Sequence, residues 1–189
     1  MKNMAVFASG SGTNAENIAK YFADSQSVRV VLVVSNNPLA GVHDRANQSG
    51  IPSVTFTNEV FMEGGEIVKL LTGYQTDWIV LAGFLKKIPD IIRNAYPDKI
   101  INIHPALLPK HGGKGMYGMR VHEAVVAAGD KESGITIHYV NENYDEGQII
   151  FQASCPVLPS DTPEDVAAKV HALEYKHYPQ VIETLLNQE

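Results

Sequence analysis

Residues 100–109 read Ile-Ile-Asn-Ile-His-Pro-Ala-Leu-Leu-Pro, and the organisation of the chain can be worked out from this stretch. The apolar residues before the first proline predict a buried strand, and the two prolines predict a turn directly after it. Because side chains alternate between the faces of a strand, Asn102 and His104 point to one face and the neighbouring isoleucines to the other. An amide and an imidazole therefore share a patch at the strand's C-terminal end.

This pair of side chains suits chemistry at a carbonyl group. An amide N–H can hold a developing oxyanion, and an imidazole can give or take a proton near neutral pH. An isolated Asn or His at a strand end is usually a structural group that hydrogen-bonds a neighbouring loop. The shared face at a strand's C-terminal end favours a functional site, since open α/β sheets bind ligands there.

Towards the N-terminus, short apolar runs alternate with helical stretches. The predicted strands are 4–8, 28–34, 51–55, 77–82 and 99–103, and the predicted helices are 15–23, 38–50, 59–71 and 89–95. Within the third helix the pair Gly64-Gly65 weakens the middle. The alternation predicts an α/β fold, a three-layer sandwich whose mostly parallel sheet carries helices on both faces.

After the central strand the pattern changes. Residues 110–118 are rich in glycine and predict a loop at the mouth of the site, from which His111 and Lys114 are candidates for ligand contact, although exposed loop charges are often only solvated. A helix is predicted at 119–128, and two strands at 134–140 and 148–156 form an antiparallel C-terminal addition. Thr162 caps a long last helix that is expected to kink near Pro179.

Residues 9–14, Ser-Gly-Ser-Gly-Thr-Asn, join the first strand to the first helix. The free N–H groups and the positive dipole end of such a helix are a natural seat for a phosphate. The stretch also satisfies Gly-x-Gly-x-x-Ala, a dinucleotide-binding pattern. However, residues 35–38 read Ser-Asn-Asn-Pro, where a nicotinamide-binding fold would place an acid for the ribose. A lone phosphate is the favoured ligand, and a purely structural tight turn is the alternative.

Length and composition limit the possible functions. The chain has 189 residues, 44% hydrophobic and 19% charged, which is enough for one core, so a single domain over 1–189 is expected. A net charge of −6 argues against nucleic acid as a partner. The single Cys155 leaves no internal disulfide, which favours a reducing cytoplasm. No apolar run reaches the length of a signal-peptide core or a membrane span, so a soluble monomer or homodimer acting on small molecules is expected.

Several motifs together carry a family resemblance. In chain order they are Leu81-Ala-Gly-Phe84, Asn102-x-His104-Pro-Ala-Leu-Leu-Pro, His138-Tyr-Val, Asp145-x-Gly147 and Glu174-x-x-x-Tyr178-Pro179. In order and spacing the chain resembles the folate-dependent formyltransferases over its whole length. The resemblance implies a Rossmann-like formyltransferase fold with a phosphate-binding half, 1–100, and a catalytic and folate-binding half, 101–189. With the glycine loop, it implies transfer of a formyl group from 10-formyltetrahydrofolate to the amine of 5′-phosphoribosylglycinamide in purine (IMP) biosynthesis, without a metal.

The resemblance places the family's catalytic trio on Asn102, His104 and Asp145. Asn102 can donate to the tetrahedral oxyanion, and His104 as imidazolium can protonate the leaving nitrogen. A carboxylate beside the imidazole favours its charged form, so Asp145 is expected to raise the pKa of His104 and to order water between them. The alternative role for Asp145 is a loop acid that satisfies backbone N–H groups.

The resemblance also implies the binding residues. The substrate phosphate is expected on Gly12, Thr13 and Asn14, and the substrate ribose near Glu174. The folate pterin is expected against Leu85, Lys86, Lys87 and Ile88 and the 141–145 loop, with Asn102, Thr136 and His138 beside it. Where the family often has an arginine for the folate glutamate tail, residues 59–62 read Glu-Val-Phe-Met. The glutamate tail is then expected to bind Lys86, Lys87 or Lys114, or to bind weakly.

Three other activities compete with this prediction. Formyltetrahydrofolate deformylases carry an N-terminal regulatory domain, whereas this chain starts directly with its first strand. Formylation of initiator tRNA uses a C-terminal RNA-binding domain, whereas this chain ends with its helix. From another class, a non-catalytic phosphosugar-binding module would need only the glycine loop. The joint presence of Asn102, His104 and Asp145 argues against that module.

Overall fold

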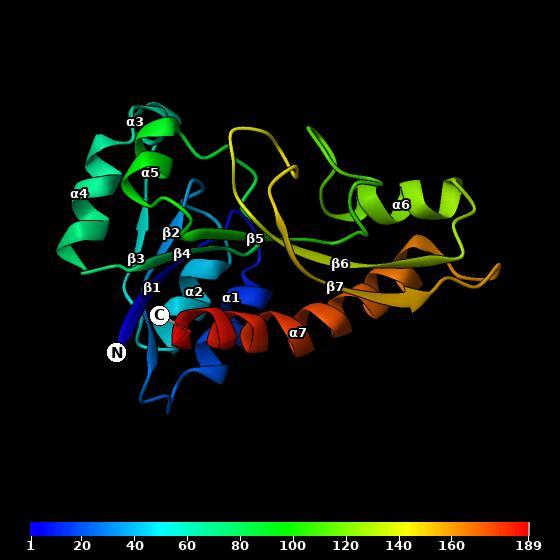
Figure 1. The fold of residues 1–189 in the computed structure, drawn as a ribbon, viewed down its shortest axis with the longest axis horizontal. Coiled ribbons are helices and arrows are strands. Elements are labelled where there is room, and N and C mark those ends of the chain that lie inside the picture. Colours follow the sequence, from blue (N-terminus) through cyan, green and yellow to red (C-terminus); the bar gives the residue numbers. More distant parts are fainter. Residues whose placement is uncertain (189) are drawn as a thin grey trace.

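Residues 1–188, which the computed structural model describes, build a seven-stranded sheet in the order β3-β2-β1-β4-β5-β6-β7 (Figure 1). The strands are β1 (Lys2–Phe7), β2 (Val28–Ser35), β3 (Ser53–Thr55), β4 (Trp78–Leu81), β5 (Ile100–His104), β6 (Glu132–Tyr139) and β7 (Ile149–Pro156). The helices are α1 (Thr13–Tyr21), α2 (Val42–Gln48), α3 (Asn58–Glu63), α4 (Gly65–Gly73), α5 (Asp90–Ala95), α6 (Met119–Ala127) and α7 (Pro163–Asn187).

The sheet has a parallel part and an antiparallel part. Strands β3, β2, β1, β4 and β5 pair in parallel, and β6 and β7 pair antiparallel with their neighbours. This confirms the predicted mostly parallel sheet with an antiparallel C-terminal addition. The order also places β1 beside β4, so the loops that follow these two strands run to opposite sides of the sheet and leave a crevice between them.

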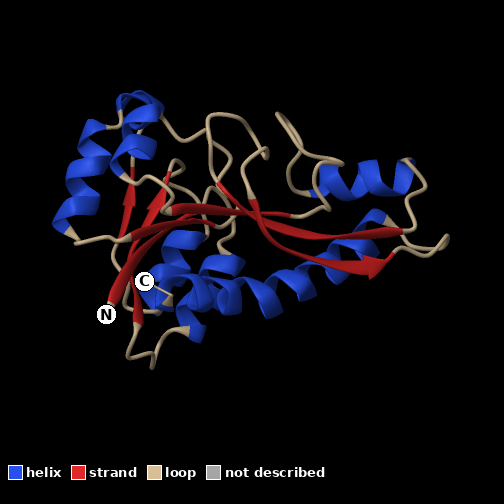
Figure 2. Ribbon diagram, in the orientation of Figure 1, coloured by secondary structure: helices blue, strands red, loops and turns tan. Residues whose placement is uncertain are grey.

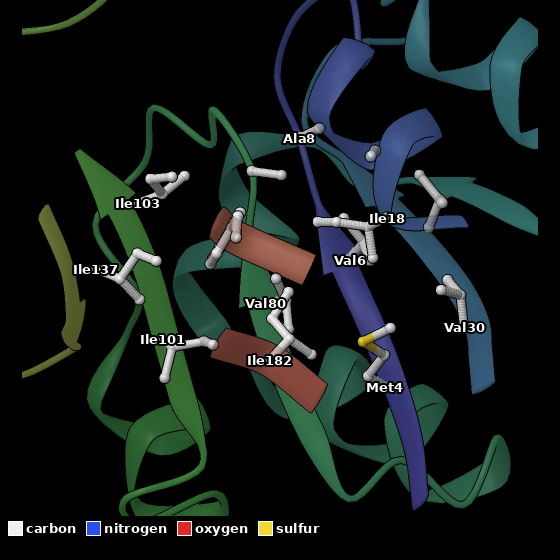
Figure 3. Packing of buried hydrophobic residues seen from close by; sticks show 14 of the residues in the cluster. Met4, Val6, Ala8, Ile18, Val30, Val80, Ile101, Ile103, Ile137 and Ile182 are labelled. Atoms are coloured by element: carbon white, nitrogen blue, oxygen red, sulfur yellow. The ribbon is translucent and has the colours of Figure 1, made fainter. Parts of the chain in front are cut away.

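Helices cover the sheet on both faces, as the alternation of elements predicted (Figure 2). One face packs its apolar side chains against α1, α2 and α7, and the other against α3, α4 and α5. Figure 3 shows the first of these cores, in which Ile101 and Ile103 of β5 lie near Ile137 of β6 and Ile182 of α7. Because the two β5 isoleucines fill this core, Asn102 and His104 must point to the opposite face.

The single helix predicted for 59–71 is wrong, because the chain forms two helices here. They are α3 and α4, and they are separated at Gly64, which has a left-handed φ of +71°. A side chain at this position would also bring its Cβ to 2.2 Å from Cγ2 of Ile91. Glycine is therefore required both by the backbone conformation and by the close approach of α5. The glycine pair ends one helix and starts another rather than weakening one.

The long last helix starts as predicted and continues through its proline. The Thr162 side chain accepts from the N–H of Asp165, and the two residues form a reciprocal capping box. Pro179 has no N–H, so the carbonyl of Tyr175 loses its usual helical donor. That carbonyl accepts from Nδ2 of Asn17 on α1 at 2.9 Å instead. The helix α7 continues past Pro179. The Tyr175 carbonyl, which has no helical donor, links α7 to α1.

Beyond β5, the face opposite α7 is covered by the turn that follows His104. The buried Thr136 hydroxyl on β6 donates to the carbonyl of Ala106 at 2.7 Å and accepts from the N–H of Leu108 at 3.0 Å. Nε2 of Gln152 donates to the same hydroxyl at 2.8 Å. These bonds hold the proline-rich turn onto the sheet, and they place the end of β5 at the wall of a cavity.

Candidate active site

A cavity of about 650 Å³ opens at the C-terminal ends of β1, β4 and β5. It is lined by most of the residues for which the sequence predicted a catalytic or binding role: Gly12, Thr13, Asn14, Leu85, Lys86, Lys87, Ile88, Asn102, His104, His138, Asp145 and Glu174. These residues come from six separate segments of the chain. The structure therefore brings the candidate catalytic, phosphate and folate residues to one place, at the crevice that the strand order creates.

The candidate catalytic residues meet at one end of β5. Asn102 and His104 lie on one face of the strand, and Asp145 reaches them from the loop between β6 and β7. Asp145 Oδ2 lies 3.5 Å from Nδ1 of His104, and Asp145 Oδ1 lies 3.6 Å from Nε2 of His138. Asp145 itself has a left-handed φ of +55°, which an aspartate tolerates better than most residues. One carboxylate thus faces two imidazoles.

The protonation of His104 follows from its hydrogen bond. Nε2 of His104 lies 2.8 Å from the carbonyl oxygen of His111, and since a carbonyl only accepts, Nε2 carries the hydrogen. The neutral ring then keeps its lone pair on Nδ1, which faces Asp145. Burial lowers the pKa of His104 below its ordinary value, although the charge of Asp145 and the His111 carbonyl act in the opposite direction. The expected raising effect of Asp145 is present, but burial outweighs it.

Asp145 is held in its charged form. Burial acts to raise the pKa of Asp145, yet contacts with His138, the charge of His104 and the N–H of Gly113 together hold that pKa below its ordinary value. The Gly113 N–H donates to Asp145 Oδ2 at 2.9 Å. Asp145 therefore faces His104 and also accepts a hydrogen bond from a backbone N–H.

His138 orients the amide of Asn102. Nδ1 of His138 donates to the carbonyl of Tyr139 at 2.8 Å, so Nε2 of the neutral ring is an acceptor. Nδ2 of Asn102 lies 3.1 Å from this Nε2 and donates to it. An amide nitrogen carries two N–H groups, so the second one of Asn102 remains for a ligand oxygen. This arrangement suits an oxyanion donor.

The other end of the cavity has the properties of a phosphate and sugar site. Gly12 has a φ of +76° and precedes α1, so the first N–H groups of a nine-residue helix open there. The buried carboxylate of Glu174 accepts from Nδ2 of Asn14 at 2.9 Å and from Nδ1 of His171 at 2.8 Å. The hydrogen bond to Glu174 raises the pKa of His171. A buried charged acceptor beside a helix N-terminus can bind hydroxyl groups of a phosphorylated sugar.

The third wall consists of residues 84–88, directly after β4. The N–H of Leu85 donates to Oγ of Ser9 at 2.9 Å, and Ser9 Oγ donates to Oδ1 of Asn36 at 2.6 Å. These bonds tie together the loops after β1, β2 and β4. The asparagine that replaces a ribose-binding acid after β2 therefore has a structural partner. The backbone of this wall is therefore held in place by side chains from two other loops.

The remaining candidates divide into those that line the cavity and those that do not. Lys114 lines it, whereas His111 does not: Nε2 of His111 binds Oδ2 of Asp130 at 2.6 Å, outside the cavity. Thr136 was expected beside the pterin but is buried in the contacts that hold the proline-rich turn. Within residues 1–188, the segment 59–62 is not part of the cavity wall.

Two histidines of the cavity wall were not predicted from the sequence. His122 on α6 is only 2% exposed, and its Nδ1 is buried without a hydrogen-bond partner. His171 lies one turn before Glu174 on α7. The spacing of His171 and Glu174 was a usable signal for a polar pair on one helix face. His122 gave no such signal, because it lies within the predicted helix 119–128 without a polar partner one helical turn away in the sequence.

Two further properties of residues 1–188 concern metals and membranes. In this range, no three or more His, Cys, Asp or Glu side chains are grouped so that they could hold a metal ion. None of the helices found there combines the length and the apolar character needed to cross a bilayer.

Comparison with known proteins shows the family of this chain. The family model described as formyl transferase matches residues 2–182. A chloroplastic phosphoribosylglycinamide formyltransferase of Arabidopsis thaliana is 43% identical over 96% of this chain, which spans 64% of that protein, slightly less than two thirds. The Bacillus subtilis phosphoribosylglycinamide formyltransferase is 39% identical over 98% of this chain and 95% of its own length. The crystal structure of glycinamide ribonucleotide transformylase 1 from Symbiobacterium toebii superposes with a TM-score of 0.90 at 30% identity, over 100% of this chain and 89% of that one.

The chain therefore belongs to the formyl transferase family. The resemblance recognised in its motifs is confirmed, and so is the fold that the family implied.

Proposed function

We propose that the protein transfers a formyl group from 10-formyltetrahydrofolate to the amine of 5′-phosphoribosylglycinamide, with tetrahydrofolate as the second product. The observation that carries the proposal is the joining of two sites in one cavity. The Asn102–His104–Asp145 cluster lies at its centre, and the glycine loop with Glu174 forms one end. The names of the similar proteins support the same reaction.

The substrate phosphate binds the N–H groups at Gly12, Thr13 and Asn14, and Glu174 accepts hydrogen bonds from the ribose. The amine then reaches towards the end of β5. On the opposite side, the pterin lies against residues 85–88 between Asn102 and His138, and Lys86, Lys87 and Lys114 at the cavity wall are available for the glutamate tail. Each proposed half of the chain contributes to the site of the other. Leu85, at the folate site, belongs to the proposed phosphate-binding half, 1–100, and Glu174, at the ribose, belongs to the proposed catalytic half, 101–189.

The reaction needs two bonds to change and one proton to move. The amine nitrogen attacks the formyl carbon, and the carbonyl oxygen becomes an oxyanion that the second N–H of Asn102 holds. The bond between the formyl carbon and the folate nitrogen then breaks. His104 protonates that leaving nitrogen and recovers a proton from the attacking amine. The negative charge of Asp145 supports the imidazolium that this proton transfer requires.

The proposal extends to the setting of the reaction. The partners are the two small-molecule substrates, and the chain acts as a monomer or homodimer in the cytoplasm. The unpaired Cys155 suits a reducing compartment. The proposal includes no metal, because Asn102 and His104 supply the oxyanion donor and the proton that the transfer needs.

A coupled assay that follows tetrahydrofolate release tests the function. We expect 10-formyltetrahydrofolate to be consumed only when 5′-phosphoribosylglycinamide is present, and mass spectrometry of the sugar product to show one added formyl group. Turnover at a comparable rate without the amine would establish a deformylase instead. Binding of the phosphosugar without turnover of either compound would establish a non-catalytic binding module.

A further inference from the structure

The turn 110–113 contacts both His104 and Asp145. As described above, the carbonyl of His111 accepts from Nε2 of His104 at 2.8 Å. Two residues further on, the N–H of Gly113 donates to Oδ2 of Asp145 at 2.9 Å. One short piece of backbone therefore sets the position of the imidazole and of the carboxylate that faces it.

The turn has little freedom of its own at His111 and Gly112. His111 has a left-handed φ of +54°. A side chain on Gly112 would bring its Cβ to 2.5 Å from Cδ2 of Leu108 and 3.4 Å from Cβ of Asp145. A left-handed φ costs a residue with a side chain conformational energy, so contacts that hold His111 stabilise the turn. A group outside the turn that binds the His111 side chain would supply such a contact.

That group is Asp130, which lies between α6 and β6 and does not line the cavity. Its Oδ2 is 2.6 Å from Nε2 of His111, and its Oδ1 accepts from Nζ of Lys110 at 3.1 Å. The side chains of His111 and Asp130 are each 17% exposed, whereas that of Lys110 is 71% exposed. The His111–Asp130 contact is shorter and better shielded from solvent than the Lys110–Asp130 contact, so it contributes more to holding the turn.

We propose that Asp130 is a positioning residue for the catalytic pair. Through His111 it fixes the turn 110–113. This turn holds the His104 imidazole and the Asp145 carboxylate in the relative position that proton transfer requires. Asp130 touches neither substrate nor reacting atoms. The kinetic part of the proposal rests on the proposed formyl transfer, whereas the effect on His104 does not.

The proposal predicts that the titration of His104 changes. Besides the turn, His104 interacts electrostatically with Asp145, His138, Glu174 and His122, and a change at Asp130 replaces none of these residues. Burial lowers the pKa of His104, whereas Asp145 and the His111 carbonyl raise it, so a turn that moves away from the imidazole shifts this pKa. A merely structural role for Asp130 would lower stability without this shift.

The test uses Asp130→Ala in the full chain, with His111→Asn as a second variant, since asparagine tolerates a left-handed φ but is too short to reach Asp130. Glu132→Gln, which removes an exposed acid two residues away, is the control and keeps wild-type values. For both variants we expect kcat to fall roughly tenfold to a hundredfold with little change in the KM of the amine substrate. NMR titration should show a changed pKa for His104 in both variants. The double variant should be no slower than the slower single variant, because both changes break one connection.

A folded Asp130→Ala with the wild-type kcat and an unchanged His104 titration overturns the proposal. Additive losses in the double variant also overturn it, because they would show two independent roles. If circular dichroism shows that Asp130→Ala does not fold, Asp130→Asn is judged by the same criteria. If the wild-type protein transfers no formyl group, the proposed function fails, and the titration of His104 in the variants still decides the role of Asp130.

Discussion

Replacing Asp145 by asparagine keeps the shape of the side chain and removes a charge that lies 3.5 Å from Nδ1 of His104. An opposite charge at such a distance raises the pKa of an imidazole by about 1–3 units, and each unit corresponds to about 1.4 kcal/mol. Loss of the charge should therefore lower the pKa of His104 by about 1–3 units, or ~1.4–4 kcal/mol. Burial already lowers this pKa, so the two effects act in the same direction.

The consequence for the rate follows from the sign of the shift. At a pH above the pKa of His104, the imidazolium fraction falls about tenfold for each unit by which the pKa drops. The formyl-transfer rate of Asp145→Asn near neutral pH should fall about tenfold to a thousandfold if protonated His104 is the active form. The alkaline limb of the kcat profile should move to lower pH, and the affinity for the amine substrate should change little.

Two measurements check this prediction, a pH profile of kcat and an NMR titration of the His104 imidazole in both proteins. The control is Glu132→Gln, which makes the same change of charge at an exposed residue of β6. An unchanged or higher His104 pKa in Asp145→Asn would show that Asp145 does not tune this histidine. Asp145 would then serve only to satisfy the Gly113 N–H or to order the folate-side loop.

Three further variants test separate parts of the structure. Gly12→Ala should lower the free energy of unfolding by about 1–2 kcal/mol from the left-handed φ alone, and by more because its Cβ would lie 2.5 Å from Val42; an unchanged urea midpoint would contradict this. Glu174→Gln should weaken calorimetric binding of 5′-phosphoribosylglycinamide by about 1.5–3 kcal/mol and leave folate binding intact, so equal losses for both ligands would refute separate sites. His122→Phe should reduce the loss of stability in acid. Burial lowers the pKa of His122 in the folded protein, so the unfolded chain binds the proton at a higher pH, and stability is lost as the pH falls below about 6.5. Urea unfolding at about pH 5 and pH 7.5 measures this, and an unchanged pH dependence would exclude a contribution of His122.

Much of the fold could be predicted from the sequence because it depends on local patterns. The spacing of apolar residues distinguishes strands from helices, and regular alternation of the two permits mainly a parallel sheet with helices on both faces. The one wrong helix, at 59–71, failed at Gly64, which ends α3 with a left-handed φ and where any side chain would meet Ile91 on a distant helix. Such a contact leaves no sign in the local sequence.

The candidate site residues could also be found from the sequence, because most of them directly follow predicted strands and because their order resembles one family. The sequence by itself thus determined most of the elements, the faces of β5 and the candidate catalytic residues. It could not show the neighbours of those residues. Asp130 lies 26 positions after His104 and is connected to it through the hydrogen bonds of His111.

The tertiary structure alone decided the strand order and the electrostatic state of the site. The adjacency of β1 and β4 creates the cavity, and it depends on pairing between segments about 70 residues apart, as in the register of Met4 with Trp78. The low pKa of His104 depends on burial by chain segments that approach it only in the folded protein. Solvation and Coulomb energies depend on distances in space, and chain order does not specify these distances.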